Sequence, residues 1–144
     1  MNHTLHIVCG LPAVGKTTYS TALAAEFKAA FFDSDTASDT LIQAAHRAAG
    51  LDPHDRDSPL YKKTYRQPVY DTLFALAHQN LPHIDVIIAG PFTSELQNQE
   101  AWQDRLNTQL APHKVKIHHL TLPEEERLQR MQKRGALRDQ AKLR

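Results

Sequence analysis

The segment from Gly10 to Thr17 constrains the fold more than any other part of the chain. Its sequence, GLPAVGKT, has glycine, glycine, lysine and threonine at every fixed position of the pattern G-x-x-x-x-G-K-S/T. The glycines allow successive backbone N–H groups to point at one anion, and a helix that begins directly after them adds its partial positive charge. The pattern therefore predicts a phosphate-binding loop between a strand and a helix, with a nucleoside triphosphate as ligand.

Two side chains of this loop carry chemistry of their own. Lys16 supplies a mobile positive charge for the β- and γ-phosphates, and the Thr17 hydroxyl is a hard oxygen ligand suited to Mg²⁺. Chance alone would match the four fixed positions in roughly one chain of this length in a hundred, or fewer. We therefore expect nucleotide contacts from Gly10, Leu11, Pro12, Ala13, Val14, Gly15, Lys16, Thr17 and Thr18.

Hydrophobic patterning alternates between strand and helix along the whole chain. Short apolar runs predict strands at 4–9, 29–32, 86–89 and 115–120. Helical spacing predicts helices from 15, from about 38 to 50, over 59–77, over 94–106 and from 124. This alternation is typical of an α/β fold with a parallel sheet. Because no repeat or interdomain linker is visible, we expect one domain over residues 1–144.

Capping residues predict where several helices begin and end. Ser58 before a proline is typical of an N-cap, and Gly50 of the residue that follows a helix. Pro68 is expected to kink or split the long helix around it. Ser94 and Thr121 are each followed, at the third residue, by Gln or Glu, which matches a capping box.

Composition excludes several classes of protein. With 17 basic and 16 acidic residues among 144, the formal charge of +1 gives no global field for nucleic acid or a membrane surface. One cysteine cannot form an internal disulfide, and the N-terminal sequence has no secretory signal, so the expected compartment is the reducing cytoplasm. The lack of any run of 18 apolar residues excludes a membrane-spanning helix.

Asp33 and Asp35 follow the second predicted strand, where ligands bind in open α/β folds. In extended backbone, residues two apart face the same side. One carboxylate beside a magnesium ion and a phosphate can orient the metal, and the other can accept the proton of an attacking hydroxyl. The alternative for either aspartate is to cap the helix predicted from about Ser38.

The chain resembles the small P-loop kinases, which include shikimate and gluconate kinases, the zeta-toxin-like kinases and the kinase domain of polynucleotide kinases. The segments that carry the resemblance are GLPAVGKTT, FFDSD, VIIAGPF and RMQKRGALRD. The resemblance implies the three-layer P-loop NTPase fold of an AAA-type ATP-binding family, in which helices flank a parallel sheet and a helical lid lies near the C-terminus. It also implies ATP and Mg²⁺ as cofactors.

The same resemblance assigns roles to individual residues. FFDSD resembles a D-x-D motif in which Asp35 would be the general base or hydroxyl anchor and Asp33 a metal-side carboxylate that also contributes to substrate binding. RMQKRGALRD resembles an arginine-bearing lid, which would bring Arg130, Arg134 and Arg138 to the phosphates.

Arg66 would flank the acceptor pocket, where similar arginines in small-molecule kinases hold an anionic group. An interpretation with at least equal support is that Arg66 lies on a solvated helix face together with Lys62 and Lys63.

The chain departs from the pattern of these kinases in two places. The strand VIIAG ends without the aspartate that normally completes the metal site. The sequence also stops at Arg144, soon after the lid-like segment, where these kinases usually continue, so the domain is either minimal or truncated after the lid.

The remaining candidate residues favour structural roles. His118 and His119 point to opposite faces of a strand, and the nine histidines show no metal-ligand spacing. Cys9 and Trp102 are interpreted as core residues.

The leading functional hypothesis is an ATP-dependent kinase that transfers the γ-phosphoryl group to a hydroxyl of a small molecule, with no membrane and no obligate protein partner. The alternatives are a polynucleotide 5′-hydroxyl kinase and a nucleotide-binding switch without catalysis. Near-neutral charge disfavours nucleic acid, because single strands are bound in basic channels.

Overall fold

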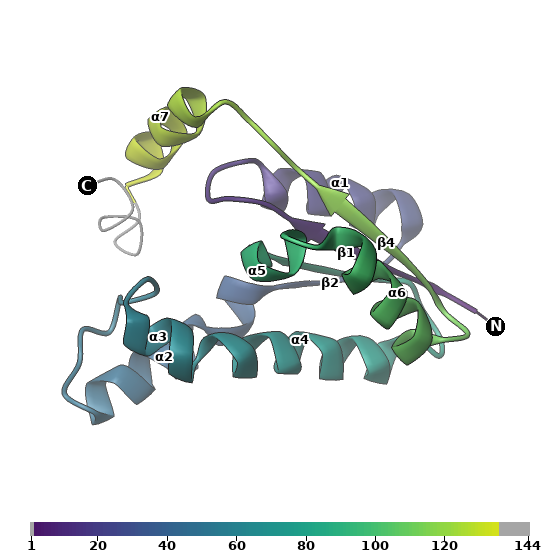
Figure 1. Cartoon of the computed structure of the whole chain (residues 1–144), viewed down its shortest axis with the longest axis horizontal. Helices are drawn as coiled ribbons and strands as arrows, with labels where there is room; N and C mark the ends of the chain where they lie inside the picture. The colour runs from purple at the N-terminus through teal and green to yellow at the C-terminus, as the bar shows by residue number, and fades with distance from the viewer. Residues whose placement is uncertain (1, 136–144) are drawn as a thin grey trace.

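A four-stranded parallel sheet forms the centre of the molecule (Figure 1). The computed structural model describes residues 2–135. The strands are β1 (Thr4–Cys9), β2 (Ala30–Asp33), β3 (Val86–Gly90) and β4 (Lys114–His119), in the spatial order β2-β3-β1-β4. All four predicted strands are confirmed to within one residue at each end. The two central strands, β1 and β3, are the apolar runs of the sequence, as expected for strands covered on both faces.

Seven helices accompany the sheet in residues 2–135. They are α1 (Lys16–Phe27), α2 (Ser34–Ala48), α3 (Pro59–Thr64), α4 (Arg66–Asn80), α5 (Thr93–Leu96), α6 (Gln99–Leu110) and α7 (Glu124–Arg134). Helix α1 covers one face of the sheet, whereas α4 and α6 cover the other (Figure 1). Helix α7 stands away from the sheet, across from α2 and α3. The predicted α/β fold, a parallel sheet with helices on both faces, is therefore confirmed.

The main core lies between the sheet and the layer of α4 and α6. Cys9, Leu73 and Trp102 are buried there, so Cys9 and Trp102 occupy the core as predicted. The ring of Phe92 stacks on Tyr70 with centroids 4.2 Å apart, and the backbone N–H of Phe92 donates to the Tyr70 hydroxyl over 2.9 Å. This contact ties the turn after β3 to the middle of α4.

Helix α2 begins at Ser34, four residues earlier than predicted. Asp33 is its N-cap, because its carboxylate accepts a hydrogen bond from the Thr36 backbone N–H over 3.0 Å. Asp33 keeps extended backbone at the end of β2, as expected, and takes the capping role given above as the alternative, whereas the extended backbone expected for Asp35 is wrong. Asp35 lies in the first turn of the helix, where a carboxylate interacts favourably with the helix dipole.

The two predicted capping boxes do not form. Helix α6 begins after Asn98, whose side chain accepts from Ala101 N, since the one-turn helix α5 ends before it. Helix α7 begins after Pro123 without a side-chain cap. Leu122 precedes Pro123, and a residue before proline is biased toward extended backbone. The helix therefore begins after Pro123, and Thr121 lies too far before it to act as the cap.

Pro68 splits the long helical segment as predicted. The break falls at Tyr65, between α3 and α4, because Pro68 has no N–H to donate to the preceding turn. Ser58 caps α3 by accepting from Tyr61 N, also as predicted, and Gly50 follows α2 in the left-handed conformation.

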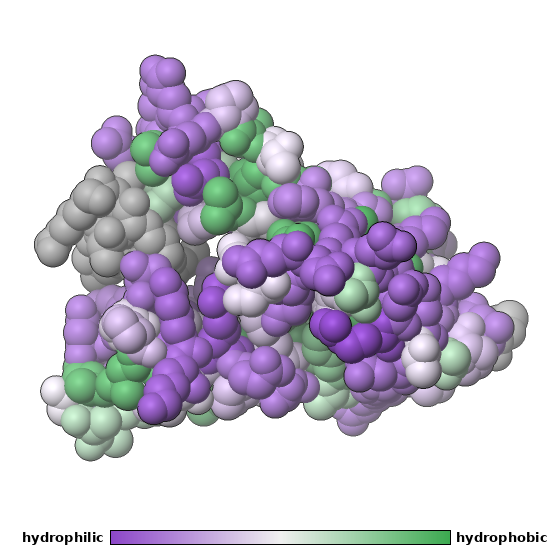
Figure 2. Space-filling model, viewed as in Figure 1, coloured by the Kyte–Doolittle hydropathy of each residue, from purple (hydrophilic) through white to green (hydrophobic). Residues whose placement is uncertain are grey.

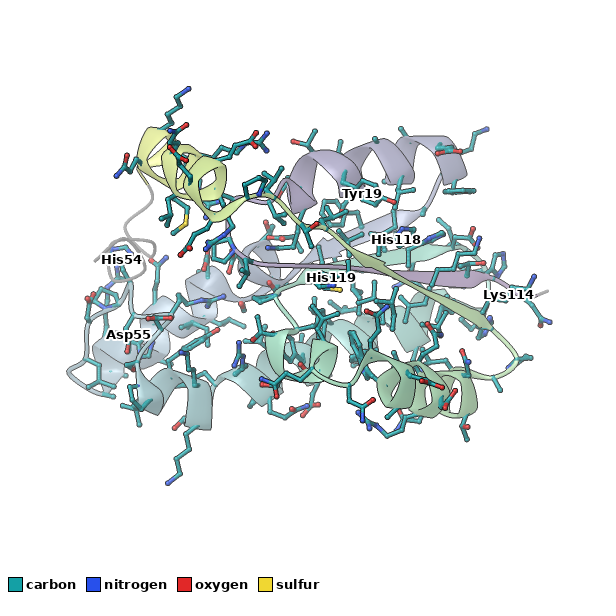
Figure 3. The ribbon with its side chains drawn as sticks, turned by 45° about the horizontal axis from the view of Figure 1, so that its top comes forward. Tyr19, His54, Asp55, Lys114, His118 and His119 are labelled. Carbon is teal, nitrogen blue, oxygen red and sulfur yellow. The ribbon has the colours of Figure 1, made fainter. Side chains whose placement is uncertain are left out.

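The apolar stripe of α1 is only partly covered. Tyr19 and Phe27 are 37% and 44% exposed, and Tyr19 reaches His118 on the same side of the sheet (Figure 3). Most of the face seen in Figure 2 is hydrophilic, with hydrophobic side chains visible at the end formed by α2 and α3 and again beside α7. No helix within residues 2–135 has the length and apolarity needed to cross a bilayer.

Candidate active site

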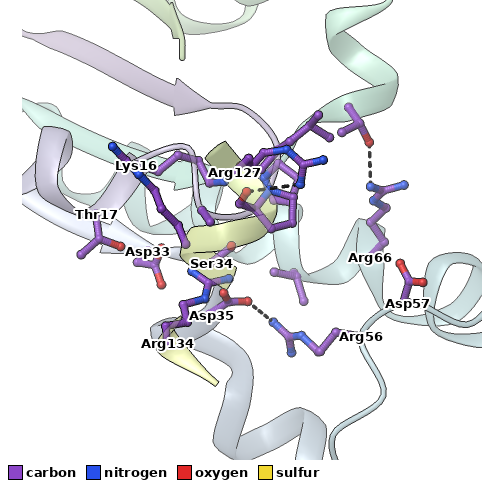
Figure 4. A pocket seen from close by; sticks show the side chains of 18 of the residues that line it. Lys16, Thr17, Asp33, Ser34, Asp35, Arg56, Asp57, Arg66, Arg127 and Arg134 are labelled. Atoms are coloured by element: carbon purple, nitrogen blue, oxygen red, sulfur yellow. Dashed lines mark hydrogen bonds and ion pairs between the residues drawn. The ribbon is translucent and has the colours of Figure 1, made fainter. Parts of the chain in front are cut away.

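A cavity of about 630 Å³ opens at the carboxyl ends of the strands (Figure 4). Its walls come from the loop before α1, the start of α2, the α2–α3 loop, α3, the start of α4, the turn after β3 and helix α7. This is the edge at which ligands bind in parallel α/β sheets. Segments distant in sequence therefore converge on one site.

The loop before α1 has the backbone geometry that its glycines permit. Gly10 and Gly15 have φ values of 146° and 101°, which L-residues rarely adopt. A Cβ atom at Gly10 would lie 2.5 Å from the carbonyl oxygen of Leu120. Leu11, Pro12, Ala13, Gly15, Lys16, Thr17 and Thr18 line the cavity. Gly10 and Val14, also predicted to contact the nucleotide, are buried behind it.

Lys16 lies folded over the loop. Its Nζ donates to the carbonyl oxygens of Gly10 and Leu11 over 2.7 and 3.0 Å. Burial lowers the pKa of Lys16 to about 8; the carboxylates of Asp35 and Asp33 oppose this, and Arg134 adds to it. A half-buried cation whose hydrogen-bond partners within residues 2–135 are two neutral carbonyls is ready to exchange them for phosphate oxygens.

The acidic pair lies beside the loop. Asp33 and Asp35 both line the cavity, although they reach it from an N-cap and from a helical turn. Asp33 also accepts from the Thr36 hydroxyl over 3.2 Å, so capping is one of its functions. Asp35 Oδ1 lies 3.0 Å from Arg56 Nη2, which makes an ion pair (Figure 4).

The arginines of α7 face the loop from the other side of the cavity. Arg130 and Arg134 line the cavity, and Arg130 pairs with Glu126 over 3.3 Å on the exposed face of the helix. Arg138 lies outside the described residues. Arg127, which the sequence analysis missed, donates from Nη1 to the Pro12 carbonyl over 3.4 Å and so connects the helix to the loop.

Arg66 lies at the far end of the cavity from Lys16. Its Nη2 donates to Thr93 Oγ1 over 2.8 Å, which fixes the guanidinium against the turn after β3. Within residues 2–135, no carboxylate oxygen lies within 4.0 Å of Arg66. Lys62 also lines the cavity but is half exposed and pairs with Asp57 over 3.7 Å. The interpretation of Arg66 as part of a solvated face is therefore only partly right.

Sequence reasoning also missed Arg56. The segment LDPHDRDS is a loop, as predicted, but a polar loop gives no signal that one of its arginines is buried. The Arg56 side chain is only 6% exposed and lines the cavity next to Asp35.

Oxygen donors suited to Mg²⁺ are present at the loop. The Thr17 hydroxyl and the Asp33 carboxylate line the same end of the cavity, and both are hard ligands. In the described part of the chain, no group of three or more His, Cys, Asp or Glu residues could hold a metal ion. A two-oxygen site still suits Mg²⁺, which is usually bound through one or two protein ligands plus phosphates and water.

A family model of an AAA domain, AAA_33, matches residues 5–143. The chain belongs to this family. The match covers the described strands and helices, except for the first residue of β1, and the whole cavity, so the family assignment does not depend on the loop motif alone. A search of curated proteins finds no match.

Several solved structures share the fold of this AAA-domain protein. A candidate kinase from Chloroflexus aurantiacus J-10-fl has a TM-score of 0.66 at 23% identity, over 94% of this chain and 68% of that one. A sugar kinase from Janibacter sp. HTCC2649 has a TM-score of 0.59 at 19% identity, and the match covers 99% of this chain and 73% of that one. A chain of the Pnkp1/Rnl/Hen1 RNA repair complex has a TM-score of 0.58 at 21% identity, and the match covers 92% of this chain and 38% of that one. The chain therefore shares its fold with these three structures, two of which are described as kinases.

Proposed function

We propose that the protein transfers the γ-phosphoryl group of ATP to a hydroxyl of a small molecule. The observation that carries this proposal is that one cavity holds the phosphate-binding loop with Lys16, a carboxylate at Asp35 and a cation at Arg66. These are the parts that phosphoryl transfer to an alcohol needs: a cradle for the triphosphate, an acceptor for the hydroxyl proton and a group that orients the acceptor.

The residues divide into a nucleotide end and an acceptor end. At the nucleotide end, the loop amides and Lys16 bind the phosphates, while Arg130 and Arg134 stabilise the charge that develops on the transferred group. Arg138 joins them in this proposal. Thr17 and Asp33 would hold Mg²⁺, which neutralises phosphate charge when bound. The new bond forms between the acceptor oxygen and the γ-phosphorus, the bond to the β–γ bridging oxygen breaks, ADP leaves and Asp35 takes the hydroxyl proton.

Arg66 indicates what the acceptor carries besides its hydroxyl. A cation without a carboxylate partner at the wall of a cavity is stabilised when an anionic ligand binds. A guanidinium binds a carboxylate or phosphate through two parallel hydrogen bonds. An alcohol with one such group therefore fits the acceptor end better than a neutral sugar does.

The test is a phosphotransfer screen with γ-labelled ATP and Mg²⁺. The panel contains hydroxy acids, sugar phosphates, neutral sugars and a 5′-hydroxyl oligonucleotide. We expect label on an anionic small alcohol, and loss of transfer in D35N and K16M but not in D104N, which changes an exposed aspartate of α6. Label on the oligonucleotide alone would favour a polynucleotide kinase, and tight ATP binding without any labelled acceptor would favour a non-catalytic switch.

A further inference from the structure

Arg56 places a buried charge next to the proposed base, with only 6% of its side chain exposed. Its Nη2 donates to Asp35 Oδ1 over 3.0 Å and to Ser38 Oγ over 2.9 Å, while Nη1 lies 3.6 Å from Asp39 Oδ1. All three partners lie within two turns of α2, so the guanidinium spans the first part of that helix. A charge is buried this completely only when fixed partners compensate the loss of water.

The loop that carries Arg56 has a fixed shape of its own. The Asp55 carboxylate accepts from the backbone N–H groups of Asp57 and Ser58 and from the Ser58 hydroxyl. These bonds lower the pKa of Asp55 despite its partial burial. The same residue's carbonyl oxygen lies 2.9 Å from Nε2 of His46, which is fully buried in α2. The loop is therefore anchored on the residues that flank Arg56 on either side.

An aromatic side chain covers the guanidinium. The Arg56 carbon Cζ lies 5.1 Å from the centre of the Tyr61 ring, in the geometry of a cation–π contact. Tyr61 is itself buried and belongs to α3, the helix that Ser58 caps. Arg56 is thus held by its loop, by α2 and by α3, and Figure 4 shows it directed at Asp35 from the side opposite the phosphate-binding loop.

We propose that Arg56 is a positioning residue for Asp35: it fixes one carboxylate oxygen and so sets the direction in which Asp35 accepts the acceptor's proton. This inference rests on the proposed function, in which Asp35 touches the reacting hydroxyl. A carboxylate at a helix start can rotate about its side-chain bonds, and an ion pair with a preorganised loop removes that freedom before the acceptor binds. Misplacement of a reacting group by about 1 Å costs on the order of 10²-fold in rate.

The kinetic test compares R56M and R56K with R47M, which removes an exposed arginine of α2, the helix that Arg56 contacts. With the acceptor found in the screen, we expect kcat of R56M to fall by about 10²-fold while the KM for ATP changes little. R56K keeps the charge but not the planar fork, so its kcat is expected to fall between those of R56M and the wild type. R47M is expected to behave as wild type.

A double-mutant comparison separates positioning from general damage to the fold. In the D35N background, R56M is expected to cost no further activity, because the group that it orients has already been removed. Equal losses in the wild-type and D35N backgrounds would overturn the proposal, as would wild-type kcat in R56M and R56K. Thermal unfolding of each variant identifies any that do not fold, and R56K then replaces R56M in the cycle.

A structural readout keeps the inference separate from the proposed function. In crystals of R56M, and of R56K where R56M does not fold, we expect the Asp35 carboxylate to be turned away from its wild-type direction, with the R47M crystal as reference. An unchanged Asp35 would overturn the positioning role even where phosphotransfer is observed. A displaced Asp35 in a protein that labels no acceptor would contradict the proposed function and leave the Arg56–Asp35 relationship supported.

Discussion

His6 Nδ1 and His118 Nε2 lie 3.0 Å apart on the adjacent strands β1 and β4. His118 Nδ1 is also 2.7 Å from the Tyr19 hydroxyl, so a chain of hydrogen bonds connects β1, β4 and α1 (Figure 3). Two imidazole nitrogens at this distance share one proton, and the contact is lost when both rings are fully protonated.

Protonation of this pair makes stability dependent on pH. Burial is the main cause that lowers the pKa of His6; His118 and Lys116 lower it further, and Asp85 opposes them. Burial also lowers the pKa of His118, with a smaller contribution from Lys116. The unfolded chain, with an ordinary histidine pKa of 6.5, therefore takes up protons before the folded protein does. The stabilisation is complete above pH 6.5 and is lost as the pH falls through the lower folded values. We expect the urea midpoint to drop between pH 7 and pH 5.

The variant H118Q tests the origin of this pH dependence. It removes one titrating ring, so the fall in urea midpoint below pH 6.5 is expected to be smaller than in the wild type. The control is H78Q, which changes an exposed histidine on α4 and should leave the slope unchanged. Equal slopes in the wild type and H118Q would show that the pair does not titrate as described.

Lys16 makes ATP binding sensitive to alkaline pH. Because its pKa in the free protein is lowered to about 8, chiefly by burial, its charge is present below pH 8 and lost above it. We expect the affinity for ATP to fall as the pH rises from 8 to 9.5, by up to about tenfold per unit where only the charged form binds. The rate at saturating ATP is expected to depend less on pH, because bound phosphates favour the charged lysine. Calorimetric titrations across this range measure the effect.

Two lysine variants separate Lys16 from the general charge of the protein. K16M is expected to bind ATP weakly and to lack the alkaline loss. K63M removes an exposed lysine of α3 that does not line the cavity, so its ATP affinity should still fall at alkaline pH as in the wild type. A wild-type affinity that stays constant from pH 7 to 9.5 would contradict the lowered pKa.

Local patterns explain why the fold could be predicted from the sequence. The run from Thr4 to Cys9, the loop motif and the helix after it are contiguous, so their arrangement follows from backbone chemistry alone. The alternation of apolar strands with amphipathic helices then favours a parallel sheet covered by helices. Asp35 could be nominated because it follows a recognisable strand end, and Arg66 because of the resemblance to small-molecule kinases.

The missing parts of the site depend on contacts between distant segments. Arg56 and Asp35 are 21 residues apart, and nothing in the loop sequence indicates that the arginine is buried. Outside the site the same holds for His6 and His118, which are 112 residues apart and meet through the pairing of β1 with β4. The extended backbone expected for Asp35 was wrong because Asp33, still extended at the end of β2, caps a helix that begins at the next residue.

The Tyr70 hydroxyl stabilises the turn after β3. It accepts from the Phe92 backbone N–H over 2.9 Å, and both residues are buried. Phe92 also adopts a left-handed φ of 48°, which a bulky residue tolerates only when its surroundings hold it. In Y70F the buried N–H loses its partner, so we expect the free energy of unfolding to fall by about 1–3 kcal/mol in urea titrations.

The control for this change is Y65F. The Tyr65 hydroxyl makes no hydrogen bond with other residues of the described chain, although its ring packs edge-on against His46. Y65F should therefore leave the free energy of unfolding within about 0.5 kcal/mol of the wild type. A Y70F protein as stable as Y65F would indicate that ring packing, which both variants keep, holds the turn rather than the hydrogen bond.

Gly10 and Gly50 both have positive φ values but differ in their surroundings. At Gly10, with φ of 146°, a Cβ would lie 2.5 Å from the Leu120 carbonyl oxygen and 3.0 Å from Val14 Cγ1. At Gly50, with φ of 72°, no heavy atom lies within 4 Å of the added Cβ. Alanine at either position carries a backbone cost of about 1–2 kcal/mol, but only at Gly10 must other backbone move.

Comparing G10A with G50A therefore separates two effects. Both variants carry the backbone strain of a positive φ, but only G10A displaces the phosphate-binding loop. Both are expected to lower the free energy of unfolding, G50A by about 1–2 kcal/mol and G10A by more. ATP affinity should be unchanged in G50A, because α2 ends far from the cavity there, and should fall at least about tenfold in G10A, since Lys16 and the loop amides move with residue 10. Unfolding curves and ATP titrations on the same samples give both quantities. If G10A bound ATP as tightly as the wild type, the added Cβ would have been accommodated without moving the loop amides. The close approach of Gly10 to Leu120 would then not determine the shape of the phosphate-binding loop.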